Sequence, residues 1–484
     1  MKLNNPELLR SQCLINGEWC DALSGKREAV INPATGVELA SIPLVSEEET
    51  QQAIAAAQRA QNDWKQLTAK QRSALLLAWA DKVLAAQEDL AQLMTAEQGK
   101  SLVEARGEVA YAASFITWFA EEAKRVDGAV LQAPQASQRL VVVKQPIGVC
   151  AAITPWNFPA AMITRKVAPA LAAGCAIIVK PAEQTPLTAL ALAKLAQDAG
   201  IPAGVLQVVT GEAAQVGRVL CDSPVVRKLS FTGSTEVGRI LMAQCAPSIK
   251  KLSLELGGNA PVIVFDDANL DAAVAGIMAS KFRNSGQTCV CANRIYVQDG
   301  IYERLAEKLV AAVEQLKVGD GSQEGTTQGP LIDSDAVAKV QSHIDDALIK
   351  GAQIATGGQP HALGGTFFQP TVVTGVTQKM RFAKEETFGP VAPLFRFHDE
   401  AEAIAMANDT EFGLAAYLFT QNAARQWRVP EALEYGMVGI NTGLISNEVA
   451  PFGGVKQSGL GREGSRYGIE EYLELKYLCI DVSC

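Results

Sequence analysis

Apolar residues in the first part of the chain recur at helical spacing, with polar residues between them. Ser46 and Glu49 have the spacing of a capping box, which marks the start of the first helix. Gly99-Lys100 interrupts the pattern and separates two later helices. The predicted helices cover residues 51–64, about 70–98, and 101–124.

The rhythm changes near Gly148, where short apolar runs begin to alternate with helical segments. This alternation predicts a parallel sheet covered by helices on both faces. Ligands of such sheets bind outside the carboxyl ends of the strands, so the residues there are the ones to inspect. We expect strands over residues 148–153, 175–180, 205–210, 228–232 and 251–256, and helices over 160–173, 186–199, 212–221 and 235–245.

A second α/β region begins with the apolar run 261–265 and continues to about residue 445. Near its start, a helix-like run ends at Ser285-Gly286, and a strand-like run follows at 294–297. Cys289 therefore lies just after a glycine turn between two elements, where a thiol is placed to react. The alternative is a buried packing role, which is common for free cysteines.

Two further runs predict strands outside these regions. Residues 138–144 alternate polar and β-branched side chains, and residues 471–480 form a strand-like tail. We expect the two to form a small protruding sheet that pairs with another subunit.

Composition narrows the class of protein. The chain has 484 residues, enough for two or three domains, with 48% hydrophobic and 20% charged residues, as in soluble globular proteins. Its net charge of −9 disfavours nucleic acid and anionic membranes as partners. The first residues lack an apolar signal segment, and the run 167–179 is too short to span a bilayer, so we expect a cytoplasmic protein.

The cysteines and histidines predict neither a disulfide framework nor a metal site. Ten cysteines are scattered along the chain, several of them in apolar runs. Cys289 and Cys291 form the only close pair, and the three histidines, at 343, 361 and 398, lie far from it without ligand spacing.

Three polar motifs follow predicted strands of the first sheet. Prolines on both sides of Asn157 fix a turn that presents its amide, although an ordinary turn would look the same. Lys180 ends an apolar strand, where it can extend into solvent or donate to a ligand hydroxyl or phosphate. Gly233-Ser234 joins a strand to a helix and lets backbone N–H groups approach a phosphate. It is not a P-loop, because Arg239 stands where lysine is required.

Two acidic residues stand in unusual contexts. Glu255 lies between leucines ahead of paired glycines, where partial desolvation would raise its pKa toward that of a general base. A turn-capping role is the alternative. Glu386 and Phe388 precede a Gly-Pro turn and by themselves would indicate a surface loop.

One formal nucleotide-binding pattern is rejected. Gly459-Leu-Gly461-Arg-Glu-Gly464 has the required glycine spacing, but no βαβ unit surrounds it. We interpret it as a flexible C-terminal loop.

The combination of residues favours one chemistry. A cysteine hydrolase needs a histidine base, and none of the three histidines has a distinctive motif. A cysteine, an amide donor, a carboxylate base and a nucleotide-binding sheet instead suit the oxidation of an aldehyde through a thioester.

The motifs around these residues occur together in a known family. The chain resembles the NAD(P)-dependent aldehyde dehydrogenases from end to end, through Thr-Pro-Trp-Asn157-Phe-Pro, Lys180-Pro-Ala-Glu-Gln-Thr-Pro, Phe-Thr-Gly233-Ser234-Thr, Leu-Glu255-Leu-Gly-Gly, Gly-Gln-Thr-Cys289 and Glu386-Thr-Phe388-Gly-Pro. It is most similar to the succinate semialdehyde dehydrogenase branch, through Ile163-Thr-Arg165-Lys, Ser280-Lys-Phe-Arg283-Asn, Cys289-Val-Cys291 and Leu444-Ile-Ser446-Asn-Glu. Glutarate semialdehyde dehydrogenases share nearly all of these motifs.

The resemblance implies an α/β fold of three parts. Residues 1–129 and 147–255 would form a Rossmann-like cofactor-binding domain, and residues 256–446 an α/β catalytic domain. Residues 130–146 and 470–484 would be oligomerisation segments of a small β-sheet, with 447–469 as a C-terminal loop region. Members of the family are usually homodimers or homotetramers.

The resemblance also implies roles for individual residues. Cys289 would be the nucleophile, and the Asn157 amide with the Cys289 backbone N–H would stabilise the oxyanion. Glu255 would activate the water that hydrolyses the thioester. The distal carboxylate of the substrate would be held by Arg165, Arg283 and Ser446. The residues implied to bind the cofactor are Pro155, Trp156, Lys180, Glu183, Gly233, Ser234, Glu386 and Phe388.

Some choices stay open. The cofactor is expected to be NAD(P)+, with NAD+ favoured because the Glu183 carboxylate would repel a 2′-phosphate, and no metal is expected. A Cys289–Cys291 disulfide would switch the enzyme off, as the resemblance suggests, but residues so close need a mobile loop to form one. Succinate and glutarate semialdehyde cannot be separated as substrates, since one methylene is worth only about 1–3 kcal/mol of discrimination. A CoA-acylating dehydrogenase and a structural protein with the same fold are further alternatives.

Overall fold

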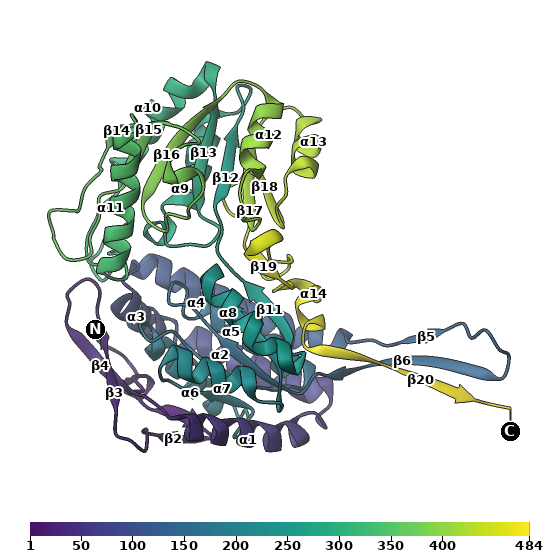
Figure 1. The fold of residues 1–484 in the computed structure, drawn as a ribbon. Helices are drawn as coiled ribbons and strands as arrows, with labels where there is room; N and C mark the ends of the chain where they lie inside the picture. The colour runs from purple at the N-terminus through teal and green to yellow at the C-terminus, as the bar shows by residue number, and fades with distance from the viewer. Residues whose placement is uncertain (484) are drawn as a thin grey trace.

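The chain folds into two α/β bodies and a long protruding arm (Figure 1). This is a computed structural model, and it describes residues 1–483. Each body is built on one sheet, and the arm is a third, three-stranded sheet that carries the C-terminus to its tip. Within the described residues, no helix is both long and apolar enough to cross a bilayer.

The first sheet has eight strands in the order β19-β11-β10-β7-β8-β9-β1-β2. Its five central strands are parallel, which confirms the prediction from the alternating pattern. Strands β1, β2 and β19 extend the sheet in antiparallel fashion and were not predicted. The bounds are β1 Cys13–Ile15, β2 Glu18–Cys20, β7 Val149–Ile153, β8 Ala176–Lys180, β9 Leu206–Val208, β10 Val226–Thr232, β11 Lys251–Glu255 and β19 Gly459–Leu460.

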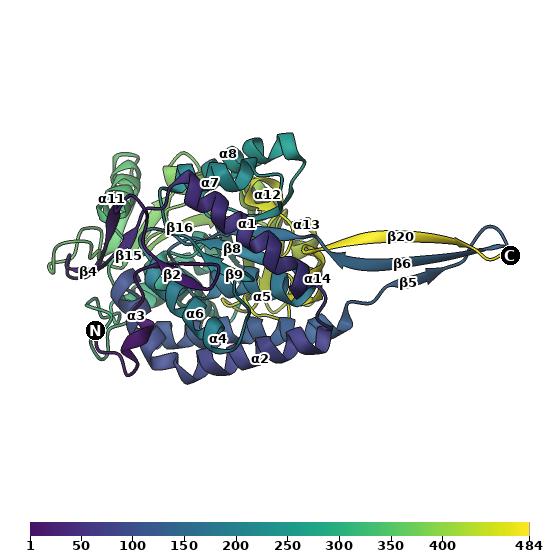
Figure 2. The same cartoon turned by 90° about the horizontal axis from the view of Figure 1, so that it is seen from below.

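Alternate side chains of these strands pack against two different helix layers, which Figure 2 shows on opposite sides of the sheet. In β8, Ile177 and Val179 pack against α2 to α6, whereas Ala176 and Ile178 pack against α1, α7 and α8. The bounds are α1 Glu47–Trp64, α2 Ala69–Ala85, α3 Gln87–Gln98, α4 Leu102–Glu122, α5 Ala161–Ala173, α6 Pro186–Asp198, α7 Ala213–Asp222 and α8 Thr235–Cys245.

Helix boundaries follow the predicted signals with one exception. The capping box at Ser46 and Glu49 is present. The single helix expected over 70–98 is wrong, because α2 and α3 are separate helices that meet at Ala86, whose φ of −95° and ψ of 14° are not helical. No glycine or proline marks this break, so the residue pattern contained no signal for it.

The second sheet has seven strands in the order β14-β15-β16-β13-β12-β17-β18, and all neighbours except β14 and β15 are parallel. The strands are β12 Ala260–Val264, β13 Ala292–Gln298, β14 Gln353–Thr356, β15 Thr371–Val376, β16 Val391–Phe397, β17 Ala415–Phe419 and β18 Met437–Ile440. Its helices are α9 Leu270–Lys281, α10 Tyr302–Val313, α11 Ser334–Ile349, α12 Glu400–Asn408 and α13 Arg425–Ala432.

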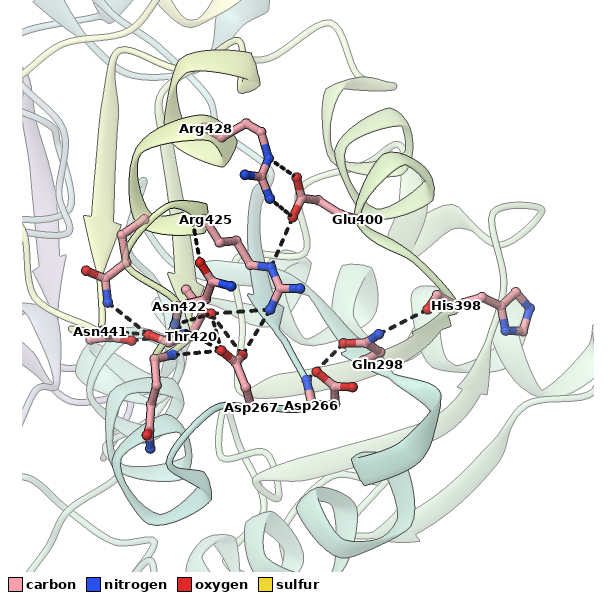
Figure 3. A network of polar contacts seen from close by, with 12 residues as sticks. Asp266, Asp267, Gln298, His398, Glu400, Thr420, Asn422, Arg425, Arg428 and Asn441 are labelled. Atoms are coloured by element: carbon pink, nitrogen blue, oxygen red, sulfur yellow. Dashed lines mark hydrogen bonds and ion pairs between the residues drawn. The ribbon is translucent and has the colours of Figure 1, made fainter.

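A charged network ties α12 and α13 to the strands of this second body (Figure 3). Arg425 forms ion pairs with Asp267 and Glu400, both at 3.0 Å, and its guanidinium lies 4.1 Å from the centre of the Phe265 ring. Arg428 pairs with the same Glu400 at 2.6 Å. These charges stabilise the packing of the two helices, and none of them lines the cavity described below.

The arm confirms the predicted small sheet. Strand β6, Gln138–Pro146, pairs with β20, Leu473–Asp481, over their whole lengths, and β5, Ala129–Leu131, adds a third strand. Apolar side chains project from it into solvent, among them Val130, Leu475 and Tyr477. Pairing with another subunit stays a prediction.

The interpretation of residues 459–464 as a flexible loop is wrong. Gly459 and Leu460 form β19, which pairs with β11, and α14, Ser465–Glu470, follows directly. Gly459 has a φ of +126°, and a Cβ there would lie 1.8 Å from the Leu254 carbonyl oxygen. The glycine therefore allows the close approach of two strands.

The remaining regular elements are a separate ribbon and short 3-10 helices. The ribbon consists of β3 Arg27–Ile31 and β4 Glu38–Pro43. The 3-10 helices are η1 Pro6–Leu8, η2 Ala123–Arg125, η3 Ala246–Ser248, η4 Arg283–Gly286, η5 Asp299–Ile301, η6 Arg381–Ala383 and η7 Lys456–Ser458.

Candidate active site

A cavity of about 300 Å³ lies where the two bodies meet. The first body contributes Asn157 and Glu255, which follow or end strands β7 and β11 at the carboxyl edge of the first sheet. The second body contributes Cys289 and Glu386, which precede β13 and β16 at the amino edge of the second sheet. The structure thus brings the three predicted catalytic residues together in one cavity.

The turn before Cys289 has an unusual backbone. Asn284, Ser285 and Gly286 of η4 have φ values of 49°, 54° and 76°, a left-handed run in which two residues are not glycine. A Cβ on Gly286 would lie 2.1 Å from the Gly389 carbonyl oxygen. This tight turn ends α9 and leaves Cys289 half-buried, facing the cavity.

The charge state of Cys289 is set mainly by burial, which raises the pKa of its thiol to about 12. Arg165 lowers this pKa, whereas Glu386 and Glu255 raise it. The thiol is therefore protonated at neutral pH in the protein alone, and Arg165 is the cation that favours the thiolate.

Asn157 is buried beside this turn. Its Nδ2 donates a hydrogen bond of 3.0 Å to the Gln287 carbonyl, two residues before Cys289. This leaves the second amide hydrogen available for a ligand. The Oδ1 atom is buried and has no hydrogen-bond partner among residues 1–483.

Glu255 is 3% exposed, and neither carboxylate oxygen has a hydrogen-bond partner in the described part of the chain. Burial raises its pKa well above the usual range, and Glu463 raises it further, whereas Arg165 and Lys166 lower it. A carboxyl group in this state can take a proton near neutral pH, as a general base must. Gly453 makes room for it, since a Cβ there would lie 2.9 Å from Glu255 Oε1.

The cavity wall has features that suit a dinucleotide. Ser234 caps α8 through a hydrogen bond of 3.3 Å from the Val237 N–H, so the helix begins at the cavity. At Gly233 a Cβ would lie 2.4 Å from the Phe231 ring, so a larger residue there would displace that ring. A helix N-terminus behind a glycine is a suitable place for a phosphate.

Trp156, Glu386 and Phe388 also line the cavity. The rings of Trp156 and Phe388 meet edge to face at 5.5 Å, and Phe388 has a left-handed φ of 55°. Glu386 accepts a hydrogen bond of 3.2 Å from the Gly258 N–H, and burial raises its pKa to about 7. Pro155 lies beside them in the wall. Lys180 and Glu183 form an ion pair at the end of β8 and do not line this cavity.

Comparison with known proteins identifies the family. The model of the aldehyde dehydrogenase family matches residues 19–478. The chain belongs to the aldehyde dehydrogenase family. The predicted class of enzyme, an aldehyde-oxidising oxidoreductase, is thereby confirmed.

Three relatives of this aldehyde dehydrogenase cover nearly all of it. The succinate-semialdehyde dehydrogenase [NADP(+)] of Escherichia coli K12 is 65% identical over 99% of this chain and 100% of the relative. The glutarate-semialdehyde dehydrogenase of Pseudomonas putida KT2440 is 64% identical over 100% of both chains. The crystal structure of succinate-semialdehyde dehydrogenase from Burkholderia pseudomallei has a TM-score of 0.99, with 63% identity and 100% coverage of both chains.

The two arginines predicted to hold the substrate differ in their surroundings. Arg165 is 1% exposed, its Nε lies 2.9 Å from Glu463 Oε2, and its guanidinium stacks 4.0 Å from the centre of the Phe452 ring. Arg283 is half-buried, lies 4.8 Å from the centre of the Phe158 ring, and has no carboxylate partner among residues 1–483. Of these two arginines, only Arg283 lacks a carboxylate partner within residues 1–483.

Tyr111 and Lys339 are residues that sequence reasoning missed. The hydroxyl of Tyr111 is buried without a hydrogen-bond partner within the described chain. Burial raises its pKa, whereas Arg165, Arg283 and a contact with Ser446 lower it, so it lies among the predicted substrate residues. Lys339 of α11 lines the cavity near Glu386. Neither residue stands in a motif, and both reach the site only through helix packing.

Cys291 points away from the cavity. It is fully buried, and the Lys281 Nζ donates to its Sγ at 3.4 Å. Cys289 and Cys291 are both free thiols, joined in a tight turn in which the Cys291 N–H donates to the Thr288 carbonyl at 3.0 Å. The possible disulfide would require this turn to open, and it stays a prediction. Among residues 1–483 no group of three or more His, Cys, Asp or Glu side chains is placed to hold a metal ion.

Proposed function

We propose that this enzyme oxidises succinate semialdehyde to succinate with NAD(P)+. The observation that carries the proposal is Arg283, which has no carboxylate partner among residues 1–483, in the group that also contains Tyr111, Ser446 and Arg165. Such a group suits the distal carboxylate of a short semialdehyde. The E. coli and Burkholderia relatives carry the same activity in their names.

Glutarate semialdehyde is the second candidate. The P. putida relative named for it is as similar as those named for succinate semialdehyde. The two substrates differ by one methylene, which a pocket discriminates by only about 1–3 kcal/mol.

The first half of the reaction uses Cys289 and Asn157. The Cys289 thiol loses its proton to solvent, and the thiolate sulfur attacks the aldehyde carbon. The Asn157 amide with the Cys289 N–H stabilises the resulting oxyanion. Bound NAD(P)+ would supply the hydride acceptor for oxidation of the thiohemiacetal carbon to a thioester. The first body, residues 1–129 and 147–255, would bind the cofactor, and residues 256–446 would supply Cys289.

The second half uses Glu255. Its carboxylate takes a proton from water as the water oxygen attacks the thioester. The carbon–sulfur bond then breaks to release the acid and the Cys289 thiolate, and the Glu255 proton returns to solvent. Glu255 lines the cavity, from which the water would reach its carboxylate.

We infer that NAD+ is preferred over NADP+. The Glu183 carboxylate would accept hydrogen bonds from ribose hydroxyls and repel a 2′-phosphate, and Glu28 lies close enough to add negative charge there. The ion pair between Lys180 and Glu183 weakens this repulsion, so use of NADP+ is also expected. The E. coli relative is named for NADP+.

We also infer that the enzyme is a homodimer or homotetramer. The exposed apolar side chains of the arm favour contact with a second copy. Partners other than the small-molecule substrate and cofactor are not proposed.

The test compares kcat/KM for succinate semialdehyde, glutarate semialdehyde and the uncharged butanal, each with NAD+ and NADP+. Arg283→Met should lower kcat/KM for succinate semialdehyde by roughly 100-fold, since hydrogen bonds to charged groups contribute about 1.5–3 kcal/mol, and should change it little for butanal. Arg218→Met, at an exposed arginine of α7, is the matched control and should have no effect.

Three outcomes would contradict the proposal. Absence of NAD(P)H formation with every C4 to C6 semialdehyde would remove the enzymatic function. An equal fall of kcat/KM for butanal in Arg283→Met would show that Arg283 does not recognise the carboxylate. Formation of an acyl-CoA rather than the free acid would favour the CoA-acylating alternative.

A further inference from the structure

Lys100 and Glu108 form a fully buried ion pair beside the active site. Their side chains are 1% and 0% exposed, and Lys100 Nζ lies 2.5 Å from Glu108 Oε2. Burying two charges is costly, and apolar residues of similar volume often replace such a pair without loss of stability. A function other than stability would explain the pair.

The remaining contact of Lys100 is with the active site. Its Nζ donates a hydrogen bond of 2.7 Å to the backbone carbonyl of Asn157, and it lies 4.0 Å from the centre of the adjacent Phe158 ring. The charged donor thus holds the main chain of the residue whose amide faces Cys289. Charge-assisted hydrogen bonds of this kind are stronger and more directional than neutral ones.

Glu108 holds the other end of the same loop. Its Oε1 accepts hydrogen bonds from the N–H groups of Ala160 and Ala161, at 2.9 and 3.2 Å, where α5 begins. The ion pair therefore fixes residues 157 to 161 at both ends, between the strand β7 and the helix α5.

The same end of α4 also holds the turn before Cys289. Glu104 accepts a hydrogen bond of 2.7 Å from the Asn284 N–H, and the Asn284 side chain donates to the Asn157 carbonyl at 3.0 Å. The Asn157 loop and the Cys289 turn are thereby attached to one rigid helix.

We propose that Lys100 and Glu108 are positioning residues that hold the Asn157 amide where the oxyanion of the Cys289 adduct forms. The inference rests on the proposed function of Asn157 as an oxyanion donor. A donor shifted by about 1 Å can lose 10²-fold in rate, so its placement needs more than the Gln287 contact.

The experiment measures the rate of NAD(P)H formation in a single turnover with succinate semialdehyde. Lys100→Met should lower this rate roughly 10- to 100-fold, with cofactor affinity and alkylation of Cys289 by iodoacetamide unchanged. In the Asn157→Ala background the same substitution should lower it no further, because Lys100 acts through Asn157. Lys250→Met is the control and should leave the rate unchanged. It removes another buried lysine, whose Nζ donates to the Ser223 carbonyl at 2.8 Å, outside the active site.

Glu108→Gln is a second variant for the case in which Lys100→Met does not fold. It keeps an oxygen for the Ala160 and Ala161 N–H groups but replaces the charged acceptor of Lys100 with an amide NH2, so we expect a slower single turnover with the same dependence on Asn157.

The outcomes separate this inference from the proposed function. Full activity of Asn157→Ala would contradict the proposed mechanism itself. A slow Asn157→Ala with a fast Lys100→Met would overturn only the positioning role. Losses that multiply in the double variant would also overturn it, because they would mean that Lys100 acts independently of Asn157.

Discussion

Within residues 1–483, several buried polar atoms without hydrogen-bond partners belong to the proposed catalytic and substrate-binding residues. They include Asn157 Oδ1, both carboxylate oxygens of Glu255 and the Tyr111 hydroxyl. Leaving such atoms unpaired costs free energy, and proteins tolerate that cost where a ligand or water completes the set. The unpaired atoms of these residues therefore lower stability, and the proposed substrate and water would supply the missing hydrogen bonds.

Glu255→Gln should separate the two half-reactions. Glutamine cannot accept the proton of water, so the first turnover should still produce NAD(P)H while steady turnover falls by roughly 10²- to 10⁴-fold. Stopped-flow absorbance would record the burst and the slow phase. In the wild type, hydrolysis should become faster as pH rises through the raised pKa of Glu255, above the usual carboxyl range, because only the carboxylate is the base. Loss of the burst in Glu255→Gln would mean that Glu255 acts before the thioester forms.

At the level of elements, glycines and a buried histidine set the spacing of the site. Gly453 and Gly459 bring the C-terminal segment against Glu255 and Leu254. The second sheet supplies the histidine. His343 of α11 contacts at 3.2 Å the hydroxyl of Thr387, the residue between Glu386 and Phe388 in the sequence. The other ring nitrogen of His343 lies 3.3 Å from a carboxylate oxygen of Glu385. The helix α11 thus supports the turn that carries two proposed cofactor residues.

Protonation of His343 should weaken this support. Burial, with a contribution from Arg381, lowers its pKa to about 4, and Glu385 opposes the shift. The unfolded chain binds a proton near pH 6.5, so the stability from the neutral ring is complete above that pH and is lost as pH falls toward 4. Between pH 7.5 and 5 the contribution of His343 to the free energy of unfolding should fall by about 2 kcal/mol.

Urea unfolding of the wild type and of His343→Gln at both pH values measures this difference. The variant should be less stable than the wild type at pH 7.5. Its free energy of unfolding should also fall less on acidification, by about 2 kcal/mol. Parallel losses in the two proteins would show that another group controls stability in this range.

At the level of the whole molecule, the active site exists only because two sheets face each other. The carboxyl edge of the first sheet supplies Asn157 and Glu255, and the amino edge of the second supplies Cys289 and Glu386. The arm extends away from both bodies, as Figure 1 shows, and its apolar side chains have no cover in the single chain.

Disruption of the arm should change the oligomeric state. Leu475 and Tyr477 are 69% and 57% exposed on β20, and charges there would prevent burial against a second copy. The double variant Leu475→Glu, Tyr477→Glu should be monomeric in light scattering after size-exclusion chromatography. Leu23→Glu with Ile249→Glu changes two exposed apolar residues of the first body and should retain the wild-type mass. An unchanged mass for the arm variant would contradict an interface at this face.

Much of the site was predictable because strand ends have local signatures. Asn157, Lys180, Ser234 and Glu255 follow apolar strands, and parallel strands bring their carboxyl ends to one edge whatever the surrounding helices do. The glycine turn before Cys289 was equally local. The break at Ala86 was not predictable, since no residue type marks it.

The sequence by itself determined the parallel pairing of the central strands of the first sheet, the residues at their ends and the position of Cys289 after a glycine turn, because these depend on patterns within a few residues. The tertiary structure decided which charges are matched. Glu463, far along the chain, neutralises Arg165 and leaves Arg283 free for a ligand. Packing of α4 brings Lys100 to the Asn157 carbonyl and Tyr111 to the arginines. Such pairings depend on how whole helices and sheets pack, which the local spacing of residues does not predict.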